Sequence, residues 1–308
     1  MNFVTPNRTE NSPYIQLLLL LAYAIAGAIL FTFIGIIIVF AMYGLTIIQN
    51  MSLLLGGDPK FTDGLKVIQI CSSIGMFLLP PIILAYTERK KPTNFYGFGK
   101  PKAILLLLVL AIMIVSMPFM EWTAVWNQKM ILPEFLKGVE RWMKEKEQDA
   151  MKMTIQLITA RNNWDFIVNL IMIAVLPAIG EELMFRGGVQ RSLNKIFESH
   201  HAAIWISAII FSAIHVQFYG FIPRMLLGAG FGYLYYFSGS IWYAMFAHFL
   251  NNAYAVCAAF YMQKHNMPLD KADEPIGFPW YAYVISVILT IALFKFFNDT
   301  AKSERKLG

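Results

Sequence analysis

The sequence predicts an all-α integral membrane protein with about eight transmembrane helices, and two observations support this fold class. First, 57% of the 308 residues are hydrophobic and only 14% are charged, whereas about a quarter of the residues in a soluble domain are charged. Second, several apolar stretches reach the roughly 20 residues that a helix needs to cross about 30 Å of hydrocarbon. Stretches of this length argue for membrane spans and against a large soluble enzyme.

Hydropathy along the chain places the expected spans near residues 15–43, 65–86, 102–120, 166–190, 203–218, 221–237, 240–261 and 278–297. Pro80-Pro81 and Pro118 are expected to kink or end the second and third spans. The first apolar run is too long for the hydrophobic region of a signal peptide and follows a polar start. We therefore expect it to be retained as the first span.

Basic residues are concentrated in the connections after the second and fourth spans and in the C-terminal tail. They are Arg89, Lys90, Lys91, Lys100, Lys102, Arg191, Lys195, Lys302, Arg305 and Lys306. The positive-inside rule therefore predicts that both termini are cytoplasmic, in what we expect to be the inner membrane of a bacterium. This distribution also accounts for the net charge of +6. Membrane lipid, rather than nucleic acid, is the expected partner of these residues.

A long polar segment, residues 121–163, separates the third and fourth spans. Tryptophans alternate in it with charged residues, and apolar residues recur at helical spacing from Phe135 to Met143. This pattern is typical of an amphipathic helix that lies in the membrane interface, anchored by its tryptophans. A solvated connector is the alternative interpretation. An interfacial helix at this position could screen the entry of a substrate.

The fourth span ends in the sequence Pro177-Ala-Ile-Gly-Glu-Glu-Leu-Met-Phe-Arg186, which places two carboxylates beside an apolar run. An ionisable side chain near the centre of a span costs about 2.5–3.5 kcal/mol, so such residues are functional candidates. Glu182 and Arg186 are four residues apart and share a helix face, which predicts a salt bridge. Glu181 points about 100° away around the helix and is expected to be free for chemistry. The alternative is a solvated cluster at a helix end.

Two further polar groups lie in later spans: His215 in the fifth, and His248 with Asn252 in the seventh. Each could be a simple hydrogen bond between helices. However, every buried polar group needs a partner, and these groups can be partners of one another. One carboxylate, two imidazoles and an amide are the groups that water-activated hydrolysis requires. We therefore predict a catalytic group of Glu181, His215, His248 and Asn252, supported by Glu182 and Arg186.

These segments resemble the three motifs of the CPBP family, the CAAX-protease and bacteriocin-processing membrane peptidases, also called Abi proteins. The motifs Glu-Glu-x-x-x-Arg, Phe-x-x-x-His and His-x-x-x-Asn read here as Glu181 to Arg186, Phe211 to His215 and His248 to Asn252. The resemblance covers about residues 165–262. It implies an intramembrane endopeptidase that acts on a membrane-associated or lipid-modified peptide or protein.

The same resemblance implies a role for each residue. Glu181 would be the general base, His215 would help to hold the attacking water, and His248 with Asn252 would line the oxyanion side. The chain is then expected to divide into accessory transmembrane helices (1–135), an amphipathic interfacial segment (136–163), a CPBP-like catalytic core (164–262), and a last transmembrane helix with a basic tail (263–308).

Dependence on a metal is left open by the sequence. Glu181, His215 and His248 could supply three ligands and leave a fourth position for water, as in catalytic zinc sites. However, the chain contains no His-Glu-x-x-His segment, which is the usual signature of zinc peptidases. We prefer a metal-free reaction in which Glu181 deprotonates a water held by His215, and zinc stays an uncertain cofactor.

Two other function classes use the same intramembrane residues. Buried glutamate and histidine also mark proton relays in transporters, although no inverted repeat or pair of broken helices is evident in the sequence. A non-catalytic immunity or scaffold protein could keep the motifs for packing alone. Counterflow uptake would identify a transporter, and a cellular phenotype that survives Glu181→Ala would identify a scaffold.

Overall fold

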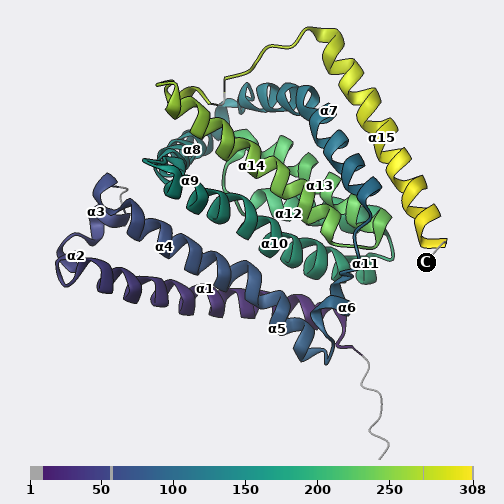
Figure 1. The fold of residues 1–308 in the computed structure, drawn as a ribbon, viewed down its shortest axis with the longest axis horizontal. Helices are drawn as coiled ribbons and strands as arrows, with labels where there is room; N and C mark the ends of the chain where they lie inside the picture. Colours follow the sequence, from purple (N-terminus) through teal and green to yellow (C-terminus); the bar gives the residue numbers. More distant parts are fainter. Residues whose placement is uncertain (1–9, 56–57, 273, 307–308) are drawn as a thin grey trace, which may run out of the picture.

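The computed structural model describes residues 10–55, 58–272 and 274–306, and within them it contains helices and no strands (Figure 1). The all-α prediction is therefore confirmed. The α-helices are α1 Pro13–Tyr43, α2 Thr46–Gln49, α3 Met51–Leu55, α4 Thr62–Ser73, α5 Leu79–Thr87, α6 Pro92–Tyr96, α7 Ala103–Gln128, α8 Lys137–Ile158, α9 Asn163–Asn169, α10 Leu176–Glu182, α11 Arg191–Phe197, α12 His200–Ala213, α13 Phe221–Ser238, α14 Trp242–Lys264 and α15 Trp280–Lys306.

Within the described ranges, five helices are long and apolar enough to cross a membrane: Pro13–Tyr43, Pro59–Thr87, Ala103–Gln128, Asn163–Phe197 and Trp280–Glu304. A polytopic membrane protein is thus confirmed, but the predicted count of eight spans is not. Helix α12 is apolar and shorter, and α13 and α14 are not among the five. Polar residues of the cavity described below lie on α13 and α14, and they lower the hydropathy of these helices.

The helices form three neighbouring groups (Figure 1). Helices α1 and α4–α5 lie side by side along one edge, and α7 pairs with α15 along the opposite edge. The long helix that contains α9, α10 and α11 runs between these edges and packs against α14, while α12 and α13 pack against each other. This central group carries all three sequence motifs.

A kink or an end was expected at Pro80-Pro81 and at Pro118, and the helices do not end at these prolines. Pro118 lies inside α7, which continues to Gln128. The hydroxyl of Ser286 on α15 donates to the carbonyl oxygen of Val115 at 2.6 Å and accepts from the amide of Phe119 at 3.2 Å. A neighbouring helix thus satisfies backbone groups beside the proline, so α7 can continue.

A close approach of two glycines holds α1 against the continuous helix Pro59–Thr87, which contains α4 and α5 and is called the α4–α5 rod here. Gly27 of α1 faces Gly75, which lies in a π-helical segment, Ile74–Leu78, between α4 and α5. A Cβ on either glycine would clash with the carbonyl oxygen of the other. Small residues let membrane helices approach closely and gain van der Waals contact. The same rod reaches the central group, where a Cβ on Gly180 would lie 3.2 Å from the Cβ of Phe77.

We expect Gly27→Leu to lower the free energy of unfolding by about 1–3 kcal/mol, because the added side chain overpacks a backbone contact. Denaturant unfolding of the purified protein in detergent would measure the change. Gly138→Leu is the matched control, since nothing lies within 4 Å of a Cβ at Gly138 in α8. Equal losses of stability in the two variants would show that the close approach of α1 and the α4–α5 rod contributes nothing.

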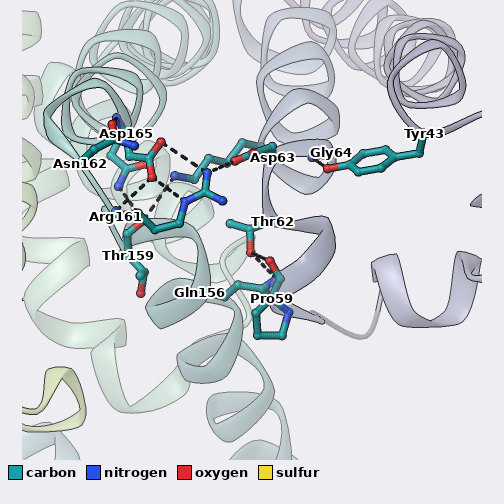
Figure 2. Close-up of polar contacts among 12 residues, drawn as sticks. Tyr43, Pro59, Thr62, Asp63, Gly64, Gln156, Thr159, Arg161, Asn162 and Asp165 are labelled. Carbon is teal, nitrogen blue, oxygen red and sulfur yellow. Dashed lines mark hydrogen bonds and ion pairs between the residues drawn. The ribbon is translucent and has the colours of Figure 1, made fainter.

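Helix α8 and the start of α9 are fastened to α4 by polar contacts (Figure 2). Arg161 donates to Asp63 of α4 at 2.6 Å and to Asp165 of α9 at 2.8 Å. Gln156 of α8 donates to the hydroxyl of Thr62 at 3.2 Å. These contacts join the segment between α7 and the central helix to the N-terminal helices. The placement of α8 in a membrane interface stays a prediction, as does the four-part division of the chain.

Several basic residues of the sequence lie at one end of the bundle and are paired. Glu10 accepts hydrogen bonds from Arg191 at 2.9 Å and from Lys195 at 2.6 Å. Lys102 pairs with Glu304 at 3.3 Å. Residues 1–9 and 307–308 lie outside the described residues. The cytoplasmic location of both termini and the bacterial inner membrane therefore stay predictions.

Stability should depend on pH through Glu10. Burial opposes ionisation, but hydrogen bonds from Lys195 and Arg191 outweigh it and lower the pKa of Glu10 from 4.5 to about 2. A group with a lowered folded-state pKa stabilises the protein above its unfolded pKa and loses that effect as pH falls. Above pH ~5, we expect the wild type to be more stable than Glu10→Gln by a constant amount of up to about 1 kcal/mol. This difference in stability should vanish as the pH falls from ~4.5 to ~2. An advantage that is unchanged at pH ~2 would contradict the ion pair. Paired unfolding curves at each pH would measure it.

Candidate active site

The first motif lies on the long central helix, where it begins between two π-helical segments, Leu170–Val175 and Leu183–Gln190, and ends inside the second. Such wider turns are rare in helices and occur frequently at functional sites, because they shift the register of the side chains that follow. Glu181 and Glu182 are the last two residues of the short α-helix α10 between them. The two carboxylates consequently point to different surroundings.

Glu182 and Arg186 form the ion pair that their spacing predicts. Nη1 of Arg186 donates to Oε1 of Glu182 at 3.0 Å, and the two side chains are 1% and 0% exposed. Nη2 of Arg186 donates to the carbonyl oxygen of Gly228 on α13 at 2.7 Å. A Cβ on Gly228 would lie 3.2 Å from that same Nη2, so the glycine leaves room for this contact. The pair therefore joins α10 to α13 beneath the cavity.

His248 of α14 connects this ion pair to Glu181. Its Nδ1 lies 2.7 Å from Oε1 of Glu182, and its Nε2 lies 3.9 Å from Oε2 of Glu181. Oε1 of Glu182 already accepts from Arg186, and we assign Nδ1 of His248 as a second donor to it. Nε2 of His248 then faces the carboxylate of Glu181. A carboxylate that binds one ring nitrogen fixes the tautomer and orientation of a histidine.

His215 does not lie inside a helix, contrary to the prediction. Helix α12 ends at Ala213, and His215 lies in the connection that follows. Val216 after it has φ of 54°, in the left-handed region that a β-branched residue rarely adopts. This turn ends the helix earlier than the apolar run does. Nδ1 of His215 donates to the carbonyl oxygen of Phe211 at 2.8 Å, which leaves Nε2 as an acceptor.

Asn252 of α14 donates from Nδ2 to the carbonyl oxygen of Ile173 at 2.9 Å. Ile173 lies four residues before Pro177, and proline has no N–H to donate to that oxygen. Asn252 therefore takes the place of an α-helical hydrogen bond. Its Oδ1 accepts from Nδ2 of Asn251 at 3.1 Å. One amide proton of Asn252 is thus committed to the backbone of the central helix.

All four predicted catalytic residues line one cavity of about 520 Å³. They are Glu181, His215, His248 and Asn252. Glu182 and Arg186 lie behind the wall and do not line the cavity. Thr154 and Leu157 of α8 also line it, so the helix that was expected to screen entry forms part of the wall.

Arg224, in the first turn of α13, lines the same cavity and was not identified from the sequence. The available signal was one arginine at the start of an otherwise apolar span. Asn251 and Gln69 also line the cavity and were not identified. Gln69 belongs to α4, so the N-terminal helices contribute to the wall as well.

The arrangement of these side chains does not decide between a metal-dependent and a metal-free reaction. In the described part of the chain, no three His, Cys, Asp or Glu side chains are grouped closely enough to hold a metal ion. The Nε2 atoms of His215 and His248 are free acceptors, as ligands must be. The carboxylate of Glu181 does not complete a set with them, and we derive no step through a metal.

Comparisons with known proteins point to one family. Residues 163–254 match the family model described as type II CAAX prenyl endopeptidase Rce1-like, and this match includes all three motifs. The uncharacterized protein YpbD of Bacillus subtilis (strain 168) is 27% identical over 143 residues, which cover 45% of this chain and 67% of that protein. No solved structure matches the chain. Through residues 163–254, the chain is thus similar to the Rce1-like peptidases of the CPBP family.

Proposed function

We propose that this chain is an intramembrane endopeptidase that hydrolyses a peptide bond in a membrane-associated or lipid-modified peptide. One observation carries the proposal: Glu181, His215 and His248 line one cavity within the Rce1-like domain. A carboxylate and two imidazoles beside a space of about 520 Å³ are suited to holding a water molecule and part of a peptide.

In the proposed reaction, Glu181 is the general base. A water oxygen attacks the carbonyl carbon of the peptide bond while the carboxylate accepts the water proton. The pair of electrons of the carbonyl double bond moves to the carbonyl oxygen. When this intermediate collapses, the C–N bond breaks, and the proton passes from Glu181 to the leaving nitrogen. The carboxylate is thereby returned to its starting state.

His215 is proposed to hold the attacking water. Its Nδ1–H is committed to the carbonyl oxygen of Phe211, so a neutral ring offers Nε2 as an acceptor for a water proton. The oxyanion role that the resemblance implies for His248 and Asn252 is harder to support. The ring of His248 is fixed by Glu182, and Asn252 donates to Ile173. We propose that both position Glu181 and the cavity wall.

The test uses purified protein in lipid nanodiscs and a synthetic peptide library in which half of the members carry a farnesylated cysteine. Mass spectrometry would identify the products. We expect cleavage by the wild type and none by Glu181→Gln, with the farnesylated members cleaved faster. A wild-type protein that cleaves no member in a Glu181-dependent way would overturn the proposal. Addition of a chelator tests the glutamate-type reaction, because cleavage that is lost and then restored by zinc would contradict it.

A further inference from the structure

Arg224 is a half-buried cation within electrostatic range of Glu147 and Glu181. Its Nη2 donates to Oε1 of Gln217 at 2.6 Å. Its Nη1 is buried and has no hydrogen-bond partner among the described residues. A buried guanidinium is costly and is normally paired. Near the N-terminus of α13 it also faces the positive end of the helix dipole, so helix stability does not explain its presence.

The guanidinium is held in one orientation beside the proposed reacting groups. Gln217 fixes one nitrogen, and a Cβ on Gly220 would lie 3.3 Å from Nη2, so the glycine makes room for it. Arg224 lines the cavity together with Glu181 and His215, and its charge is within electrostatic range of both. It is the one lysine or arginine among the described residues that line this cavity.

Several of the other polar groups of the cavity have one donor in use. The Nδ1–H groups of His215 and His248 are committed to Phe211 and Glu182. One amide proton of Asn252 is donated to a backbone oxygen. Hydrolysis of a peptide places negative charge on the carbonyl oxygen, and a preorganised donor must meet that charge. Nη1 of Arg224 is a charged donor in this cavity that is buried and has no hydrogen-bond partner among the described residues.

On the basis of the proposed peptidase function, we propose that Nη1 of Arg224 donates a hydrogen bond to the scissile carbonyl oxygen as it becomes an oxyanion. Arg224 is then a second catalytic residue, with a role that differs from that of Glu181. One residue removes the proton of the water, and the other stabilises the charge that the attack creates. A charged donor in a poorly solvated site is stronger than a neutral amide.

The test compares kcat and KM for the library peptide that the wild type cleaves fastest. We expect Arg224→Met to lower kcat about 10²–10³-fold, as removal of one oxyanion donor does, with KM changed less than about threefold. Arg224→Lys should recover part of kcat, because lysine keeps the charge without the planar geometry. Arg191→Met is the matched control. It removes a guanidinium outside the cavity and should leave kcat unchanged.

Two outcomes would overturn the inference alone. One is an Arg224→Met variant with the kcat of the wild type. The other is a raised KM with unchanged kcat, which would make Arg224 an anchor for an anionic group of the substrate. If Arg224→Met does not fold, Arg224→Gln decides, since a kcat equal to that of the wild type would again exclude a charged oxyanion donor. Failure of the wild type itself to cleave any peptide would overturn the proposed function instead.

Discussion

Replacing Glu181 by glutamine is expected to lower the rate of peptide hydrolysis about 10²–10⁴-fold, the range that a positioned general base contributes. The substitution keeps the shape of the side chain and its place in the cavity wall. It removes the lone pair that accepts the water proton. Because the amide is neutral, the electrostatic attraction between position 181 and Arg224 also falls. The rate of product formation in nanodiscs, measured by mass spectrometry, checks this expectation.

Two comparisons separate chemistry from folding in this experiment. Glu10→Gln removes a carboxylate that pairs with Arg191 and Lys195 outside the cavity, and it should leave the rate unchanged. Glu181→Gln should also elute from gel filtration in detergent as the wild type does. A Glu181→Gln protein that cleaves at the wild-type rate would exclude Glu181 as the base and would require a different proton acceptor.

The second large effect is expected from Arg186→Met, which should lower the free energy of unfolding by about 3–5 kcal/mol. The variant leaves Glu182 buried without its cation, and its side chain is 0% exposed. It also removes the hydrogen bond to the carbonyl oxygen of Gly228. The cost arises because a buried charge that has lost its partner keeps its full desolvation penalty. Denaturant unfolding in detergent measures the loss.

A double variant tests whether the loss comes from the unpaired charge. Arg186→Met combined with Glu182→Leu removes both charges, and exchange of a buried ion pair for apolar residues is often close to neutral. We expect it to be more stable than Arg186→Met alone, although His248 then loses its acceptor. The two residues act independently if Glu182→Leu destabilises the Arg186→Met protein by as much as it destabilises the wild type.

Helix geometry explains why part of the site could be read from the sequence. Residues four apart lie on one face of a helix, and on that basis Glu182 was paired with Arg186. The same rule placed Glu181 away from that pair, and it lines the cavity while Glu182 and Arg186 lie behind it. Long apolar stretches likewise identified membrane helices, because the thickness of the hydrocarbon sets their length.

Contacts between helices, in contrast, could not be obtained from spacing. Hydropathy carried the fifth predicted span on to residue 218, whereas α12 ends at Ala213 and His215 lies in a turn. Apolar residues continue through that turn, so composition alone gives no sign of it. Asn252 donates to Ile173 opposite Pro177, a contact that helical spacing did not predict. Such pairings depend on how two distant helices are aligned.

The sequence by itself determined that this chain is an α-helical membrane protein with a Glu-Glu-x-x-x-Arg helix, because length, polarity and helical periodicity act locally. Tertiary structure decided which of the polar side chains share a cavity and which donors they have left. Arg224 shows the difference. Its proposed role depends on an Nη1 atom that has no hydrogen-bond partner and on a cavity that it shares with Glu181 and His215. Burial and hydrogen-bond satisfaction are properties of the packed helices, and no single segment specifies them.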